Sequence, residues 1–298
     1  MILRLPCVPK GFARHRLGMI SLVLLIALSI LALCAPLIAA LLNIDPVNVD
    51  LYQRLEGPSL FHPLGTDALG RDLLLRLFYG GRVSLGIGFT AALISALIGT
   101  AIGLVAGYYG GRTDALLMRL TDGVIALPLL PLLIVLAAVD YSKLGFGAIF
   151  QDSPNAGFYR LVLIISLVGW TTVARLVRGA ALSLREREFV LAAQAQGASG
   201  WRIMGLHILP NVLTPIIVAT TLSVGNIILF ESVLSFLGLG IQPPVPSWGN
   251  MLSSAQDMIW THPGLSIYPG FFIFITVIAF NLLGDGLQDM MSPDDPDI

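Results

Sequence analysis

Asn226 and Glu231 are the side chains in this chain whose types and surroundings most suggest a chemical role. They lie in residues 211–236, a stretch that is otherwise apolar except for hydroxyl groups and Asn211. Polar groups at membrane depth are costly and usually face protein or a water-filled path. Hydroxyls there often bond back to their own helix, whereas an amide and a carboxylate can line or gate a path. Asn226 and Glu231 are therefore candidate path or gate residues.

The chain contains none of the common motifs that would place a reaction on it. A zinc peptidase helix needs His-Glu-x-x-His, a serine hydrolase needs Gly-x-Ser-x-Gly, and a nucleotide loop needs Gly-x4-Gly-Lys-Ser/Thr. The sequence thus indicates no catalytic residue, no metal site and no cofactor bound by this chain. An intramembrane enzyme has no support.

Residues 45–82 hold a second group of polar and turn-forming residues. Gly65 allows a turn, Thr66 can cap a helix, and Asp67 would complement the helix dipole in its first turn. Leucines then recur on one face at four-residue spacing: Leu69, Leu73 and Leu77. The pattern predicts a short amphipathic helix at the membrane interface, broken by two glycines, Gly80 and Gly81, before the second span. A simple lead-in to that span is the alternative.

Residues 182–210 form a polar, helix-prone segment. Its first half is rich in strong helix formers, and Gly197 can end that helix in a left-handed conformation. Ser199 suits the N-cap of a second short helix, and Pro210 marks a bend into the next span. The sequence therefore predicts two short helices at the membrane surface.

The elements that must position these residues are membrane helices. Of the 298 residues, 56% are hydrophobic and 12% are charged, against about 25% charged in soluble domains. A bilayer core needs roughly 20 apolar residues per helix. Six charge-free gaps separate these pairs: Arg16 and Asp45, Arg82 and Arg112, Asp122 and Asp140, Arg160 and Arg175, Arg202 and Glu231, and Asp257 and Asp285. The fourth gap is short, so its helix must extend past Arg175 or Arg178. We predict an all-α integral membrane protein with six transmembrane helices.

Small residues and prolines shape individual spans. Gly99, Gly103 and Gly107 recur every four residues, which predicts a seam of close helix packing. Pro128 and Pro131 interrupt the third span, since each removes a backbone hydrogen bond. Later, a proline-rich stretch should be extended, with Trp248 at the membrane interface.

The placement of Lys and Arg predicts the orientation of the chain. If the N-terminus is inside, the inner segments carry eleven basic residues and the outer segments six. This bias favours both termini in the cytoplasm. The predicted division is a cytoplasmic segment 1–16, a first span 17–44, an outer segment 45–82 and a five-helix core 83–298 that contains the cytoplasmic loop 182–210. A net charge of −1 indicates no nucleic-acid partner.

Two separate groups of residues resemble the permease subunits of ABC importers. In the cytoplasmic loop, the family pattern E-A-A-x3-G-x9-I-x-L-P is matched at Ala192, Ala193, Gly197, Leu209 and Pro210, while Leu191 replaces the Glu and His207 the first Ile. The outer segment and the last span resemble the second permease of oligopeptide and dipeptide importers at Gly65, Thr66, Asp67, Gly70, Arg71, Asp72, Arg76, Gly284 and Asp285.

The resemblance implies a function that the composition alone does not give. Such a permease forms half of a path for peptides or similar solutes in the cell membrane. It pairs with a related permease, two ATPase subunits that use the ATP, and an extracytoplasmic solute-binding protein. Its loop would dock on an ATPase, with Ala192 and Ala193 presented as a small knob.

An ion-coupled secondary transporter is the alternative function. That class often shows internal repeats and paired charges at the bilayer midplane. No convincing repeat is present, and Glu231 is the only formal charge inside an otherwise apolar run. The sequence does not identify the transported substrate: relatives with this signature carry peptides, nickel, glutathione or sugars.

Overall fold

The computed structural model describes residues 15–139 and 155–291, and within these ranges the chain is helical, without a sheet strand. The α-helices are α1 (Arg16–Leu42), α2 (Leu73–Tyr109), α3 (Gly111–Ile125), α4 (Leu129–Ala138), α6 (Ala156–Leu184), α7 (Glu188–Ala195), α8 (Gly200–Ile203), α9 (Leu209–Phe236), α10 (Trp248–Ser254) and α11 (Gly264–Met291). A π-helical turn, Met204–Ile208, joins α8 to α9, and 3-10 turns lie at Leu51–Gln53 and Gln256–Met258.

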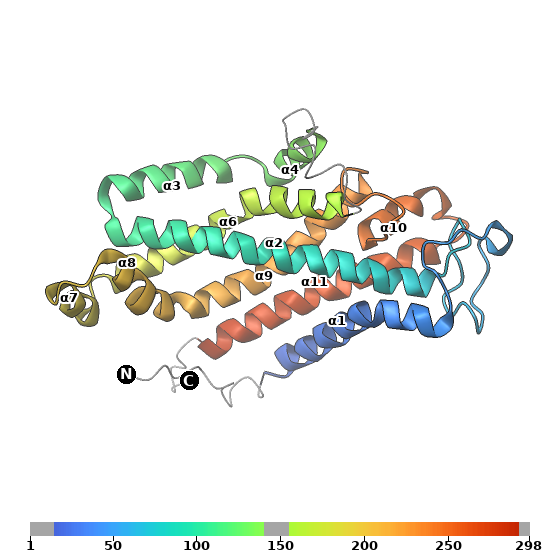
Figure 1. Ribbon diagram of the computed structural model, residues 1–298, viewed down its shortest axis with the longest axis horizontal. Coiled ribbons are helices and arrows are strands. Elements are labelled where there is room, and N and C mark those ends of the chain that lie inside the picture. The colour runs from blue at the N-terminus through green and yellow to red at the C-terminus, as the bar shows by residue number, and fades with distance from the viewer. Residues whose placement is uncertain (1–14, 140–154, 292–298) are drawn as a thin grey trace.

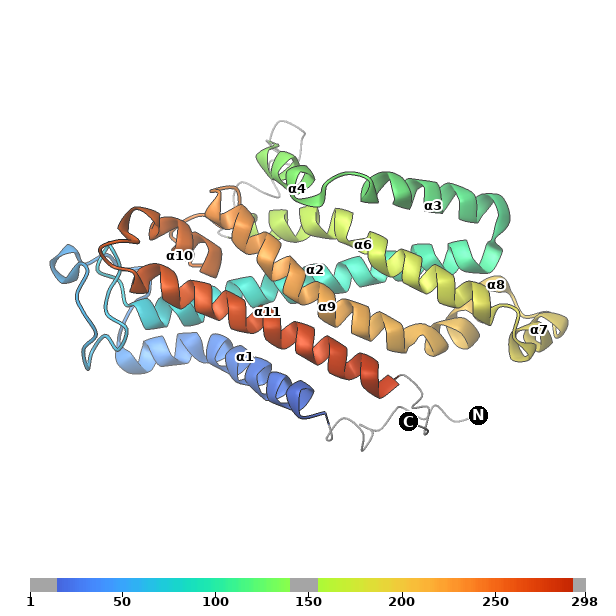
Figure 2. The ribbon, with the colours of Figure 1, turned by 180° about the vertical axis from the view of Figure 1, so that it is seen from behind.

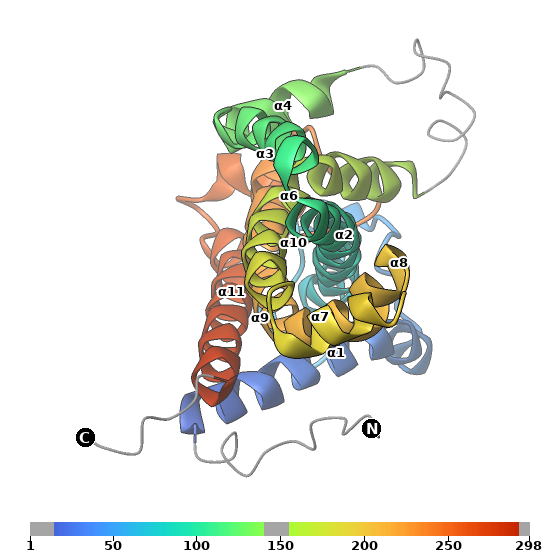
Figure 3. The same ribbon diagram turned by 90° about the vertical axis from the view of Figure 1, so that its left-hand side faces the viewer.

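The long helices run side by side along the longest axis of the molecule (Figures 1 and 2). At one end lie α7 and α8, and at the other lies α10; we call these the α7 end and the α10 end. Figure 3, seen from the α7 end, shows α2, α6 and α9 between α1 and α11 on one flank and α3 and α4 on the other. Asp289 of α11 lies 3.4 Å from His15, beside the start of α1. The loop that contains α7 is thus directed toward the same side as the start of α1 and the end of α11.

Five helical segments of the described chain are long and apolar enough to cross a membrane, and α3 with α4 makes a sixth if that bent pair is one span. This agrees with the predicted all-α fold of six spans. The first span, expected at residues 17–44, corresponds to α1. The predicted segment 1–16 lies almost wholly outside the described residues, as do the last residues of the predicted core.

The α2–α6 interface contains the predicted seam of glycines. A Cβ added at Gly103 would stand 2.6 Å from the carbonyl oxygen of Ala174, and one at Gly99 would stand 2.5 Å from that of Trp170. At Gly107 it would meet the Cβ of Ala181 at 2.6 Å. The absence of side chains lets the two backbones touch, as the four-residue spacing predicts.

The third span is interrupted at Pro128 as predicted, whereas Pro131 lies inside the first turn of α4 without a break. The helices α3 and α4 meet at an angle of 83°, and Pro128 occupies the N-cap of α4. Proline cannot donate the backbone hydrogen bond that a continuous helix needs there. By contrast, α6 continues past Arg175 and Arg178, as its short charge-free gap required.

The predicted interfacial helix before the second span is wrong. The second span, α2, begins at Leu73, and Asp72 caps its N-terminus. The helix then runs without a break through Gly80 and Gly81. The indole of Trp248 packs against these two glycines. A Cβ added at Gly80 would stand 3.2 Å from the nearest indole atom, and for one at Gly81 that distance would be 2.9 Å. Glycine here serves close packing, and a membrane helix keeps its backbone bonds satisfied internally.

Candidate functional site

The polar residues of the outer segment build a folded cap at the α10 end. Thr66 does not cap a helix: its hydroxyl donates to Gln53 O and accepts from Glu56 N at 2.9 Å. Gly65 and Gly70 have positive φ angles of 80° and 74°. A Cβ at Gly70 would collide with the carbonyl of Asp50 at 1.7 Å, so only glycine fits this turn.

Asp67 is the centre of the charged network in this cap. Its carboxylate accepts from Arg71 Nε at 2.8 Å and lies 3.3 Å from Arg76 Nε. Arg76 also donates to Pro46 O at 3.1 Å, and Asp72 caps α2 through Leu75 N. Asp67, Arg71, Asp72 and Arg76 therefore hold the outer segment against the start of α2.

His62 lies in the same cap and makes contacts that the sequence did not predict. Its Nδ1 lies 2.9 Å from Asp72 Oδ2, and its Nε2 lies 3.1 Å from Gln53 Oε1. No local pattern links residues 53, 62 and 72.

Gly197 ends α7 as predicted. Its φ is +78°, its N–H donates to Gln194 O at 2.9 Å, and the next N–H, of Ala198, donates to Ala193 O at 3.0 Å. These two bonds define a Schellman motif, which satisfies carbonyls at a helix C-terminus. A Cβ at position 197 would touch nothing within 4 Å, so only the backbone conformation demands glycine.

The predicted two-alanine knob is only partly correct. Ala192 is exposed, but Ala193 is buried with Val190 against the α7 end of the bundle. The exposed large apolar side chains of α7 are Phe189 and Leu191. Exposed apolar side chains at the end of a bundle, such as Phe189 and Leu191, can form a docking surface.

The predicted second short helix is not separate. From Gly200 to Phe236 the helical backbone is continuous through the π turn. Ser199 occupies the N-cap without a side-chain bond. Leu209 and Pro210 directly follow the π turn, where the N–H of Leu209 bonds five residues back to Met204 O. Pro210 therefore does not break this helix from the span.

Asn226 is exposed on α9 and lines two cavities, of about 390 and 670 Å³. Ser223 and Thr172 also line both. The smaller cavity lies among α3, α4, α6 and α9, and the larger among α6, α9 and α11. Hydroxyl and amide groups at this depth can accept and donate hydrogen bonds to a polar solute.

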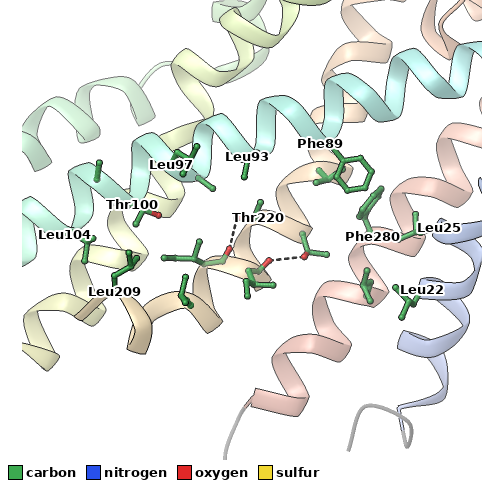
Figure 4. Close-up of a pocket in the computed structure, with 18 of the residues that line it drawn as sticks. Leu22, Leu25, Phe89, Leu93, Leu97, Thr100, Leu104, Leu209, Thr220 and Phe280 are labelled. Carbon is green, nitrogen blue, oxygen red and sulfur yellow. Dashed lines mark hydrogen bonds between the residues drawn. The ribbon is translucent and has the colours of Figure 1, made fainter. Parts of the chain in front are cut away.

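A larger cavity, of about 990 Å³, lies on the other side of α9, between α1, α2 and α11 (Figure 4). Its walls are almost entirely apolar, with Leu93, Leu97 and Phe280 among them. The hydroxyls of Thr220 and Thr221 point back to Ile216 O and Ile217 O at 2.6 and 2.9 Å. Such walls offer a polar solute few partners, so size alone does not mark the path.

Glu231 lies apart from Asn226. Its side chain is fully buried and lines none of these cavities. The carboxylate accepts from Ser84 Oγ of α2 and from Ser235 Oγ of α9, both at 2.8 Å. In this conformation Glu231 is thus a packing centre between helices.

The two signature residues of the last span have different surroundings. Gly284 is buried, and a Cβ there would stand 2.3 Å from Leu222 Cδ2, which sets the close approach of α11 to α9. Asp285 is exposed at the α7 end of α11.

Trp248 was predicted to lie at the membrane interface, but it is buried inside the protein. It is 1% exposed, and its Nε1 donates to Leu77 O at 2.9 Å. It begins α10, whose N-terminus carries a reciprocal cap between Ser247 and Asn250. The sequence signal for this helix was Ser-x-x-Asn, a variant of the capping box that the proline-rich surroundings concealed.

Two family models match the chain. The binding-protein-dependent transport system inner membrane component matches residues 99–294. The N-terminal TM domain of oligopeptide transport permease C matches residues 10–58.

Curated relatives match nearly the full length. The chain is 40% identical to the dipeptide transport system permease protein DppC of Alkalihalophilus pseudofirmus, over 95% of this chain and 88% of that protein. It is 36% identical to the oligopeptide transport system permease protein OppC of Bacillus subtilis, over 95% and 87%. Against the glutathione transport system permease protein GsiD of Pectobacterium atrosepticum it is 40% identical, over 85% and 80%.

Among solved structures, the inward-facing MetNI methionine ABC transporter has a similar fold. The TM-score is 0.57 at 16% sequence identity, with 74% of this chain and 98% of that chain covered. At this identity the similarity concerns the fold alone.

Proposed function

The chain belongs to the family of binding-protein-dependent transport system inner membrane components and is a permease of an ABC importer, and we propose that it forms half of a path for peptides or similar small solutes. The observation that carries the proposal within the molecule is the position of Asn226, Ser223 and Thr172. They bring amide and hydroxyl groups to cavities on one side of α9. A peptide backbone consists of amide donors and acceptors, which such groups can match.

The proposed partners are a second, homologous permease, two ATP-binding-cassette ATPases and an extracytoplasmic solute-binding protein. The open cavities at Asn226 support a second permease, because a half path needs another wall. The exposed apolar side chains of α7, Phe189 and Leu191, support an ATPase at that end. Leu191 replaces the family Glu, so apolar contact would contribute more to docking here than a salt bridge.

In this proposal the chain itself binds no nucleotide or other cofactor, and ATP is used by the partner ATPases. The α7 end faces the cytoplasm, together with both termini, and the α10 end faces the solute-binding protein. The excess of basic residues in the segments at the α7 end supports this orientation. The chain is a multi-pass component of the cell membrane.

Reconstitution tests the proposal against the ion-coupled alternative. The chain is placed in liposomes alone, with the second permease, and with the ATPases and solute-binding protein as well, and peptide uptake and ATP hydrolysis are measured. Uptake should require the complete set and ATP. Gradient-driven uptake by the isolated chain would support a secondary transporter instead.

A further inference from the structure

We propose that Glu231 is a positioning residue that fixes residues 237–247 and α10 to α2 and α9, and so links the α10 end to the helix that reaches the α7 end. The proposal rests on the proposed function and adds a role for a side chain that lines no part of the path. A fully buried carboxylate is expensive and persists only where its oxygens are satisfied.

The first step is the symmetry of the hydrogen bonds. The two carboxylate oxygens of Glu231 accept from two different helices: Oε2 from Ser84 Oγ of α2 and Oε1 from Ser235 Oγ of α9, both at 2.8 Å. A serine hydroxyl has one proton to donate and can still accept. Ser84 Oγ accepts from Trp248 N at 3.3 Å, and Ser235 Oγ accepts from Ile241 N at 3.0 Å. We call this arrangement the serine relay. In each of its two branches a backbone N–H donates to a serine hydroxyl, and that hydroxyl donates to the carboxylate of Glu231.

The second step is what the relay holds. Ile241 lies in the loop after α9, and Trp248 is the first residue of α10. The fit around the relay is close, because a Cβ at Gly240 would stand 2.2 Å from Ser235 Oγ and one at Gly249 would stand 2.6 Å from Ser232 O. Removing the carboxylate leaves two buried serine protons without their acceptor and loosens both attachment points of the loop.

The third step is where a displacement would go. Glu231 lies on the helix that is continuous from Gly200 to Phe236, and that helix also carries Asn226 and the exposed Trp201 and Leu206. A solute-binding protein that pushes on α10 would therefore act on this helix through the relay. We expect the relay to be needed for stimulation of ATP hydrolysis by the binding protein, and dispensable for assembly and basal hydrolysis.

The experiment uses the reconstituted complex with four variants of the relay: Glu231→Ala, Glu231→Gln, Ser84→Ala and Ser235→Ala. Basal hydrolysis should remain within about twofold, while stimulation by loaded binding protein should fall about tenfold in Glu231→Ala. The other three should be intermediate, because a glutamine oxygen or a remaining serine preserves one branch. Ser95→Ala is the matched control, a buried serine of α2 with no hydrogen-bond partner among the described atoms, and should behave as wild type.

A second readout follows α10 directly. With Cys7 and Cys34 replaced by alanine, Ala255→Cys places a thiol at a site that is 2% exposed. A water-soluble maleimide should label it about tenfold faster in Glu231→Ala than in the parent or Ser95→Ala. Unchanged labelling, intact stimulation, or a parallel loss of basal hydrolysis would each overturn the proposal. If the wild-type complex shows no stimulation, the proposed function fails, and the labelling still decides whether Glu231 positions α10.

Discussion

Arg178 of α6 holds Asp114 of α3 through two nearly matched bonds, Nε to Oδ1 at 2.5 Å and Nη2 to Oδ2 at 2.6 Å. Thr121 is the one residue of α3 that is buried, so α3 packs lightly on the bundle. A second pair, Arg175 with Asp122, is about half exposed on both sides. Of these two ion pairs between α3 and α6, the Arg178 pair is the less exposed, and we expect it to contribute more to the position of α3 beside the candidate path.

Arg178→Lys should weaken the attachment of α3 by roughly 1 kcal/mol, because an ammonium group cannot reproduce the two-bond geometry. Hydrogen exchange of α3 amides in detergent should accelerate about fivefold. Arg175→Lys is the control and should change little, since exposed pairs contribute little. The exchanged double variant, Asp114→Arg with Arg178→Asp, should recover part of the protection; if it recovers none, the pair is not the attachment.

Gly103→Ala should lower the melting temperature of the purified protein. The added Cβ would stand 2.6 Å from Ala174 O and 2.8 Å from Val177 Cβ, and overpacking of this kind costs about 1–3 kcal/mol. Gly123→Ala is the control, because nothing lies within 4 Å of its Cβ. Equal melting temperatures for the two variants would argue against the α2–α6 seam.

Gly197→Val should leave insertion and assembly intact but uncouple ATP hydrolysis from uptake. The left-handed backbone costs a β-branched residue about 1–2 kcal/mol, which would change the path of the chain between α7 and α8. Gly197→Asn should retain coupling, because asparagine tolerates this conformation. Normal coupled uptake by the valine variant would show that the turn is not needed.

Asn226→Asp should reduce uptake of acidic peptides about tenfold relative to neutral ones, because it places a negative charge on the wall of the candidate path. Competition uptake with a matched pair of labelled peptides measures the ratio. Thr221→Val changes a polar residue on the opposite, apolar cavity and should leave the ratio unchanged. A ratio that moves equally in both variants would place the path elsewhere.

A thiol at Gln194 should react with a membrane-impermeant reagent only in inverted vesicles. Gln194 is exposed on α7, and the α7 end is proposed to face the cytoplasm. With both native cysteines replaced, Gln194→Cys is compared with Leu60→Cys, whose parent side chain is 99% exposed at the α10 end. The second thiol should react only from outside. The reverse pattern would invert the proposed topology.

Features determined by nearby residues were predictable from the sequence. The charge-free gaps predicted the spans, the spacing of Gly99, Gly103 and Gly107 predicted the seam, and the left-handed turn at Gly197 followed from the residue itself. Each of these depends on one helix or one turn, where local preference and burial act in the same direction.

Features determined by distant partners were not predictable. Gly80 and Gly81 suggested a helix break, because nothing near them in sequence indicates that Trp248 fills their surface; its indole bonds to a carbonyl 171 residues away. Likewise Thr66 had the sequence of a helix cap, but its hydroxyl is engaged by Gln53 and Glu56. For Glu231, chain position suggested a path residue, whereas its two serines place it in the interior.

The uninterrupted length of α2 has a mechanical consequence. Its 37 residues extend about 55 Å at a rise of about 1.5 Å per residue, whereas the hydrocarbon core of a bilayer is about 30 Å thick. The helix must therefore tilt or protrude, and its inclination varies with the thickness of the surrounding lipid. Trp248 bonds to Leu77 near the N-terminal end of α2. At the C-terminal end of α2, Gly110 lies against Arg185, which precedes α7. A change of about 10° in inclination would move that end by roughly 10 Å, so we expect bilayer thickness to affect where the α7 end of this helix lies.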